Sequence, residues 1–360
     1  MSKISFYNLK DQYEEQKYDI MRAIHDVAIG GQYFSDQAVI KFESLISKLY
    51  NRASVVATNS GTSALTVALK SLKLPQNSFV IVPAMTYVAT ANAVKAAGLE
   101  PIILDIDQHW LLDYSMTEDY LSSGKIAAVV VVDLYGQGVA LEKFRTLCDY
   151  YKVKLVVDAA QSFEMYYKQY HQIDYCDALA LSFNPLKNLG AMGNAGAVVS
   201  KIYSVEHLKK FTIHGQLNGN IETPGYNCRI DALQAAVLNV KYKLFDENMK
   251  RKSDISNYYR FYLSDLVEMP LRNFECTHTN YVFPIAPKNP NVVRNALEAA
   301  GIEYGCHYTK PLHHFTAYAD SKDYAPNASL LSGRIVSLPN HWHLTISEIE
   351  KIVQVVKSAL

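Results

Sequence analysis

Apolar positions follow two alternating patterns between about residue 50 and residue 200. Short runs that are apolar throughout are typical of strands buried on both faces of a sheet. They cover residues 79–83, 101–106, 126–136, 154–160, 177–183 and 196–200. Between them lie segments with apolar residues at helical spacing, among them SGTSALTVALKSL, TYVATANAVKAAG and LEKFRTLCDYYK. This repeated β-α order predicts an α/β domain with a mostly parallel central sheet and helices on both faces.

The pattern changes after residue 230. Residues 231–262 interleave apolar and basic positions and predict one long helix or two, followed by a strand at 280–285, a helix at 291–301 and a terminal helix at 346–360. We therefore expect a large α/β domain with an N-terminal arm over residues 1–245. A smaller α+β domain would follow over residues 246–360.

Composition narrows the class of protein. The 360 residues are 49% hydrophobic, with 35 basic and 35 acidic side chains, and this balance argues against a nucleic-acid partner. No apolar run approaches the roughly 18 residues that span a membrane, and the N-terminus has no apolar stretch fit for a signal peptide. Five dispersed cysteines without C-x-x-C spacing indicate reduced thiols. We expect a cytoplasmic protein with no membrane partner and, since no metal-ligand spacing occurs, no metal.

One lysine occupies an unusual setting. Lys187 lies in SFNPLKNLGAMGNAGAVVS, residues 182–200, on a loop of small residues between two apolar runs. A solvated lysine needs no such place. A lysine that must lose its proton and react covalently does, because burial lowers the pKa of its ammonium group.

Two other features accompany the lysine. NSGTSAL, residues 59–65, opens a helix, and its N-terminus is either a phosphate site or an ordinary Ser/Thr cap. Asp158 ends a strand, where its carboxylate either binds a ligand or caps the next helix. In combination these features fit pyridoxal phosphate (PLP): the helix holds the phosphate, Asp158 keeps the ring nitrogen protonated, and Lys187 forms the Schiff base and moves the α-proton.

At this point the sequence resembles a known family. The motifs above, with PAMTYVATANAV, DLYGQ, VVDAAQS, GYNCRIDALQAAVL and VSLPNHWHLT, are similar to those of the DegT/DnrJ/StrS-type sugar aminotransferases. Those enzymes have the PLP-dependent transferase fold type I, like aspartate aminotransferase. The resemblance covers nearly the whole chain. It implies a homodimer whose active sites lie at the subunit interface.

The resemblance also implies site residues. The cofactor would be bound by Gly61, Thr62 and Ser182 at the phosphate, Tyr87 stacked on the ring, Asp158 at the ring nitrogen, Gln161 near the ring hydroxyl, Lys187 as the Schiff-base residue, and Asn227 at the phosphate of the other subunit's cofactor. A core role for Tyr87 is the alternative. Arg229 would meet a substrate anion or pair locally. His307, Tyr308, His313 and His314 would be substrate-side or structural polar groups.

The function implied is transfer of an amino group from L-glutamate to a nucleotide-linked keto-deoxysugar, with the cofactor cycling through pyridoxamine phosphate (PMP). The loop KNLGAMGNAGA is more similar to that of family members that aminate C3 than to that of members that aminate C4. One alternative is a PLP/PMP-dependent deoxysugar dehydratase, but those enzymes carry histidine at the lysine position. Another is a non-catalytic PLP-fold protein that binds a metabolite, which would not need Lys187. An NAD-dependent epimerase would need G-x-G-x-x-G, which the chain lacks.

Overall fold

A seven-stranded sheet forms the centre of the computed structural model, which describes residues 3–34, 37–319 and 325–360. Its strand order is β1-β9-β8-β5-β4-β2-β3. The strands are β1 (Ser54–Thr58), β2 (Phe79–Pro83), β3 (Glu100–Leu104), β4 (Ile126–Val132), β5 (Lys154–Asp158), β8 (Ala178–Ser182) and β9 (Gly196–Ser200). Only β9 runs antiparallel to its neighbours within this sheet. The expected mostly parallel sheet is therefore confirmed.

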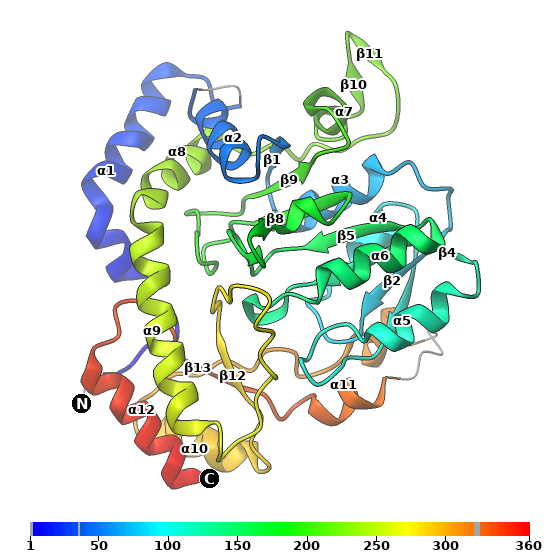
Figure 1. Cartoon of the computed structure of the whole chain (residues 1–360). Coiled ribbons are helices and arrows are strands. Elements are labelled where there is room, and N and C mark those ends of the chain that lie inside the picture. The colour runs from blue at the N-terminus through cyan, green and yellow to red at the C-terminus, as the bar shows by residue number, and fades with distance from the viewer. Residues whose placement is uncertain (1–2, 35–36, 320–324) are drawn as a thin grey trace.

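Helices cover both faces of the sheet. Figure 1 shows α5 (Tyr114–Leu121) and α6 (Leu141–Tyr151) on one face, and α3 (Gly61–Ser71) and α4 (Ala89–Ala96) on the other. Further helices are α1 (Leu9–Gly30), α2 (Gln37–Leu49) and α7 (Val205–Lys210), and short hairpins are formed by β6 (Tyr166–Tyr167) with β7 (Tyr170–His171) and by β10 (Gln216–Leu217) with β11 (Asn220–Ile221). No helix in the described ranges is long and apolar enough to cross a membrane.

Two expected elements have different bounds. The apolar run at 126–136 ends its strand at Val132, because Tyr135 has a φ of 59° and a short 3₁₀ turn follows. The segment at 231–262 forms two helices, α8 (Ala232–Lys241) and α9 (Phe245–Leu263), separated by a 3₁₀ turn at Tyr242–Leu244. Apolar spacing alone did not distinguish one helix from two.

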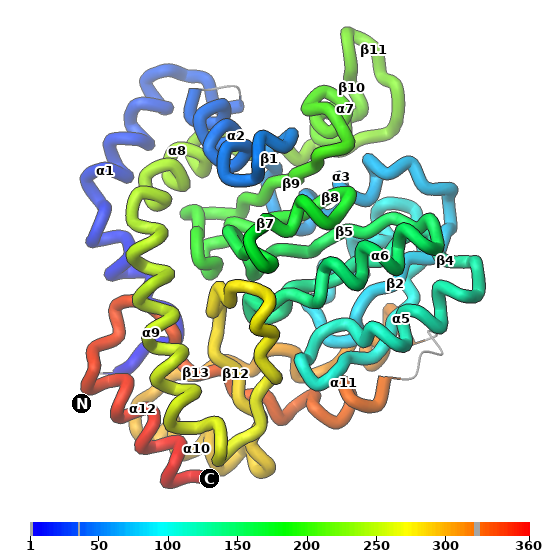
Figure 2. The backbone as a smooth tube through the Cα atoms, in the orientation of Figure 1, coloured from blue at the N-terminus to red at the C-terminus, as the bar shows by residue number. Residues whose placement is uncertain are grey.

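The C-terminal part has its own apolar core. Strands β12 (Phe283–Ile285) and β13 (Val336–Leu338) pair antiparallel beside α10 (Pro290–Ala299) and α12 (Ile346–Ala359). The strand expected at 280–285 starts later, because Asn280 has a φ of 50°. Ile4 from the N-terminal segment joins this core through a bridge to Ile302, and Figure 2 shows the N-terminal segment beside the C-terminal elements.

The boundary expected between residues 245 and 246 stays a prediction. Several residues beyond it, including those on α11 (Pro326–Leu331), pack in the core around the large sheet: Leu312, Tyr318, Ala325, Ala328, Leu331 and Ile335. The C-terminal part thus contributes to both cores.

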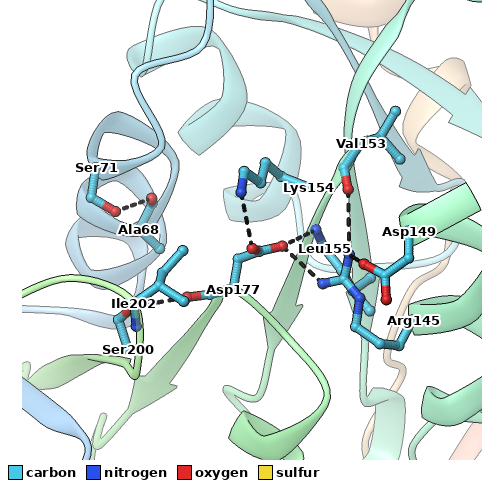
Figure 3. Close-up of polar contacts among 10 residues, drawn as sticks. All are labelled: Ala68, Ser71, Arg145, Asp149, Val153, Lys154, Leu155, Asp177, Ser200 and Ile202. Carbon is cyan, nitrogen blue, oxygen red and sulfur yellow. Dashed lines mark hydrogen bonds and ion pairs between the residues drawn. The ribbon is translucent and has the colours of Figure 1, made fainter. Parts of the chain in front are cut away.

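A polar cluster ties the strands together at the start of β8. The Asp177 carboxylate accepts from the Arg145 guanidinium at 2.9 Å, from the Lys154 ammonium at 3.2 Å and from the Leu155 N–H at 2.8 Å (Figure 3). The Asp177 carbonyl accepts from the Ser200 hydroxyl at 2.9 Å. Asp177 therefore links α6, β5, β8 and β9.

Replacing Asp177 with alanine is expected to lower the free energy of unfolding by about 3 kcal/mol, because it removes the buried carboxylate partner of Arg145 and leaves the Leu155 N–H without its acceptor. Urea denaturation of the cofactor-free protein measures this. Asp149→Ala is the matched control: Asp149 also pairs with Arg145, but its side chain is 66% exposed, so we expect a change of about 0.5 kcal/mol or less. Equal losses in both variants would contradict this role of Asp177.

Candidate active site

A cavity of about 600 Å³ lies where β5 and β8 end and α3 begins. Carboxyl ends of parallel strands are the usual place for ligands in such sheets. Nine of the residues expected at the site line this cavity: Gly61, Thr62, Tyr87, Asp158, Gln161, Ser182, Lys187, His307 and Tyr308. They come from segments spread over about 250 positions of sequence, and the fold brings them to one place.

Lys187 lies on a loop that is stabilised by hydrogen bonds among the loop's own residues. Its N–H donates to the Asn184 carbonyl at 2.8 Å, and the Asn184 side-chain amide donates to Asn194 Oδ1 at 3.0 Å. The Lys187 ammonium sits 4.3 Å from the centre of the Tyr281 ring. The side chain therefore projects to an aromatic wall of the cavity.

Asp158 is buried at the floor of the cavity. One carboxylate oxygen accepts from the Thr90 hydroxyl at 2.9 Å, and the other accepts from the Ala160 N–H at 3.2 Å. Burial raises the pKa of Asp158, and these two hydrogen bonds and the charge of Lys187 oppose that rise. A buried carboxylate with few donors favours a cationic ligand group beside it.

The N-terminus of α3 faces the same cavity. Ser60 caps this eleven-residue helix by accepting from the Ser63 N–H at 3.1 Å, and Gly61 and Thr62 follow as lining residues. Gly61 lies so close to β8 that a Cβ added to it would be 2.6 Å from the Ser182 Cβ. A helix N-terminus without side-chain bulk, next to a serine, is a fitting place for a phosphate group.

Gly61→Ala is expected to weaken PLP binding by about tenfold or more, because the new methyl group displaces Ser182 or the helix N-terminus. The dissociation constant for PLP, measured by fluorescence or absorbance titration, checks this. Thermal unfolding of the cofactor-free variant serves as the control for folding. An unchanged dissociation constant would argue against the phosphate at this helix.

Gln161 connects Tyr308, which lines the cavity, to the buried Tyr135. Its amide nitrogen donates to the Tyr308 hydroxyl at 2.7 Å, and its amide oxygen accepts from the Tyr135 N–H at 2.8 Å. The rings of Tyr135 and Tyr308 meet edge to face with centres 5.7 Å apart. Both tyrosines have a φ near 60°, which non-glycine residues rarely adopt. Burial raises the pKa of Tyr308, so its hydroxyl stays protonated at neutral pH.

Tyr7 and Tyr281 are cavity residues that sequence reasoning missed. The Tyr7 hydroxyl lies 3.4 Å from the Tyr281 hydroxyl and 3.5 Å from His307 Nε2, while His307 Nδ1 lies 2.9 Å from the Ser337 hydroxyl. Burial, with a smaller effect of the Lys187 charge, lowers the pKa of His307 to about 4, so its ring is neutral at pH 7. Tyr7 and His307 are 300 residues apart in the sequence, so no local pattern predicts that they meet.

Four predicted residues lie outside the lining of this cavity. Asn227 is exposed and forms a backbone bridge with Ile213. The Arg229 guanidinium lies 4.7 Å from the centre of the Phe34 ring, and His313 Nε2 lies 3.1 Å from the Ser329 hydroxyl. His314 contacts the same serine at 3.4 Å. In the part of the chain that the structure describes, His313 and His314 therefore have structural partners, and Arg229 stacks on an aromatic ring.

Comparison with known proteins agrees with the family resemblance of the sequence motifs. A sequence model of the DegT/DnrJ/EryC1/StrS aminotransferase family matches residues 14–357. The chain is 30% identical to the erythromycin biosynthesis sensory transduction protein EryC1 of Saccharopolyspora erythraea, covering 99% of each chain. It is 29% identical to the UDP-2-acetamido-2-deoxy-3-oxo-D-glucuronate aminotransferase of Pseudomonas aeruginosa, covering 97% of this chain and 98% of that protein.

The fold is likewise that of a solved relative. The crystal structure of S. venezuelae DesV in complex with a ketimine intermediate matches with a TM-score of 0.94 at 29% identity, covering 100% of this chain and 99% of that one. The expected type I fold of PLP-dependent transferases is thereby confirmed.

Proposed function

Because the chain belongs to the DegT/DnrJ/EryC1/StrS aminotransferase family, we propose that it is a PLP-dependent enzyme that transfers an amino group from L-glutamate to a nucleotide-linked keto-deoxysugar. The observation that carries this proposal is the convergence of Lys187, Asp158 and the α3 N-terminus on one cavity. Each of the three has the chemistry that one part of the cofactor requires.

The residues present fit PLP. The N-terminus of α3 with Ser182 would bind the phosphate, the buried Asp158 would pair with the protonated ring nitrogen, and Tyr87, 65% exposed at the cavity, is free to cover the ring. Gln161 would lie near the ring hydroxyl. When bound, PLP takes up the amino group from the donor and passes it to the acceptor, with the ring accepting negative charge.

Lys187 has two tasks in this proposal. Its amine would anchor the cofactor between turnovers. Its Nζ would take the proton from the α-carbon of the donor in the first half-reaction and deliver a proton to the former carbonyl carbon of the acceptor in the second. The contact with the Tyr281 ring holds the Lys187 side chain at the cavity in which the cofactor would bind. The neutral His307 and the protonated Tyr308 offer hydrogen-bonding groups that leave the charge balance of the cavity unchanged, which suits recognition of sugar hydroxyls.

The names of the relatives support the substrate class. The Pseudomonas relative is named for a UDP-linked 3-oxo sugar, and the Saccharopolyspora relative for erythromycin biosynthesis. We infer a keto sugar carried on a nucleotide, with amination at C3 favoured over C4. We also propose a cytoplasmic homodimer in which Asn227 reaches the partner's cofactor phosphate and Arg229 lies near the substrate of a shared site.

Product analysis tests the proposal. The enzyme is incubated with PLP, L-glutamate and either a 3-keto or a 4-keto nucleotide sugar, and the amino sugar and 2-oxoglutarate are quantified by mass spectrometry. We expect equal amounts of both products from the 3-keto sugar. Formation of neither product from either sugar would overturn the proposed substrate class, and preference for the 4-keto sugar would overturn only the position.

A further inference from the structure

A second lysine lies buried behind the first. Lys252 on α9 is 5% exposed, and the described residues form no ion pair with it. Its ammonium donates to Asn188 Oδ1 at 2.7 Å and to the Tyr281 carbonyl at 3.0 Å. A buried lysine without a carboxylate is costly to keep, so its contacts need a reason beyond packing.

Both partners of Lys252 belong to the immediate support of Lys187. Asn188 is the next residue in the chain, and Tyr281 carries the ring over which the Lys187 ammonium sits. Lys187 and Lys252 also line one small cavity of about 20 Å³, together with Tyr281. The buried amine therefore links the lysine loop to the segment that provides its aromatic wall.

The linkage continues to the cofactor side of the cavity. The Asn188 amide nitrogen donates to the Thr279 carbonyl at 2.8 Å, and the Thr279 hydroxyl donates to the Gln161 carbonyl at 2.7 Å. Gln161 itself lines the large cavity. Without the Lys252 amine, Asn188 Oδ1 and the Tyr281 carbonyl would be buried acceptors with no donor. Because an unpaired buried acceptor is costly, we expect both groups to move until they find another partner.

We propose that Lys252 is a positioning residue of the active site, which holds Asn188 and the Tyr281 carbonyl and thereby fixes Lys187 over the Tyr281 ring. The inference rests on the proposed role of Lys187. Burial lowers the pKa of Lys252 to about 7. The charged amine has three N–H donors and the neutral amine two, so either form can serve both acceptors.

Borohydride trapping provides a readout besides turnover. The protein is mixed with PLP, reduced, digested, and the fraction of Lys187 carrying the reduced cofactor is measured by mass spectrometry for the wild type, Lys252→Met and Lys250→Met. Lys250 is an exposed lysine on the same helix and serves as the matched control. We expect Lys252→Met to reduce the initial trapping rate and kcat by about 10- to 100-fold, with the KM for L-glutamate nearly unchanged, since misplacement of a reacting group by about 1 Å has effects of this size. Lys250→Met should match the wild type.

A second variant keeps the inference testable if Lys252→Met does not fold. Asn188→Leu removes one acceptor and leaves the Lys252 amine. The double variant Lys252→Met/Asn188→Leu tests whether Lys252 and Asn188 act together. We expect Asn188→Leu to slow trapping as well, and the double variant to be no slower than Lys252→Met by more than about twofold. Unchanged trapping in Asn188→Leu, or in a folded Lys252→Met, overturns the inference. No trapping at Lys187 in the wild type would instead overturn the proposed function.

Discussion

Replacing Lys187 with alanine is expected to lower kcat by about 10⁴-fold, since the side chain both anchors the cofactor and moves the proton. The alanine variant should still fold, because Lys187 lines a cavity and its backbone hydrogen bond to Asn184 does not need the side chain. Formation of 2-oxoglutarate from L-glutamate in the presence of PLP and acceptor measures the loss.

The control for this experiment is Lys250→Ala, which removes an exposed lysine on α9 away from the cavity lining. It should retain wild-type turnover and the same melting temperature. The alanine variant at Lys187 should still bind PLP through the helix N-terminus and Asp158. Full activity in Lys187→Ala would end the proposal that this lysine carries the chemistry.

Asp158→Asn is expected to lower kcat by about 100- to 1,000-fold, because a neutral amide no longer stabilises positive charge on the ring nitrogen. The reacting lysine remains in place, so the loss is smaller than in Lys187→Ala. Turnover with L-glutamate checks the size of the effect, and Asp158→Glu tests whether the charge alone is sufficient at this position.

Asp158→Asn should not destabilise the cofactor-free protein. Burial raises the pKa of Asp158 in the folded state, so the folded protein binds this proton more tightly than the unfolded chain does. As the pH rises through the raised pKa, the proton is lost and the free energy of unfolding falls. Asparagine avoids that decrease. At pH 7 the melting temperature of cofactor-free Asp158→Asn should therefore equal or exceed that of the wild type, with a smaller difference at pH 4. A large decrease at pH 7 would show that the carboxylate is structural.

The sequence predicted six of the seven strands of the central sheet, all except β1, and their bounds only to within a few residues. Asp158 and Ser182 lie near the ends of two predicted runs and end β5 and β8 in the structure, and Lys187 follows on a loop of small residues. Their meeting at one edge of the sheet follows from parallel strand order. The bounds were wrong where the backbone turns at a residue with positive φ, as at Tyr135 and Asn280. Such turns depend on tertiary contacts that apolar spacing does not contain.

The remaining site residues depend on long-range contacts. Tyr7 meets His307 from the opposite end of the chain, and Tyr281 and Lys252 approach Lys187 from segments beyond α8. In the sequence, Tyr7 is one tyrosine among 26 and Lys252 belongs to an ordinary basic helix face. Neither position has a local pattern that separates it from a solvated or core residue.

The central claim is that the cavity around Lys187 binds PLP and uses it to take the amino group from L-glutamate. The most direct test is the visible absorbance of the purified protein with PLP, recorded before and after addition of L-glutamate without any sugar. The account predicts a yellow band that decreases on addition of glutamate, with one equivalent of 2-oxoglutarate released per active site. A protein that binds PLP with no change on addition of glutamate, or that develops no band at all, would contradict it.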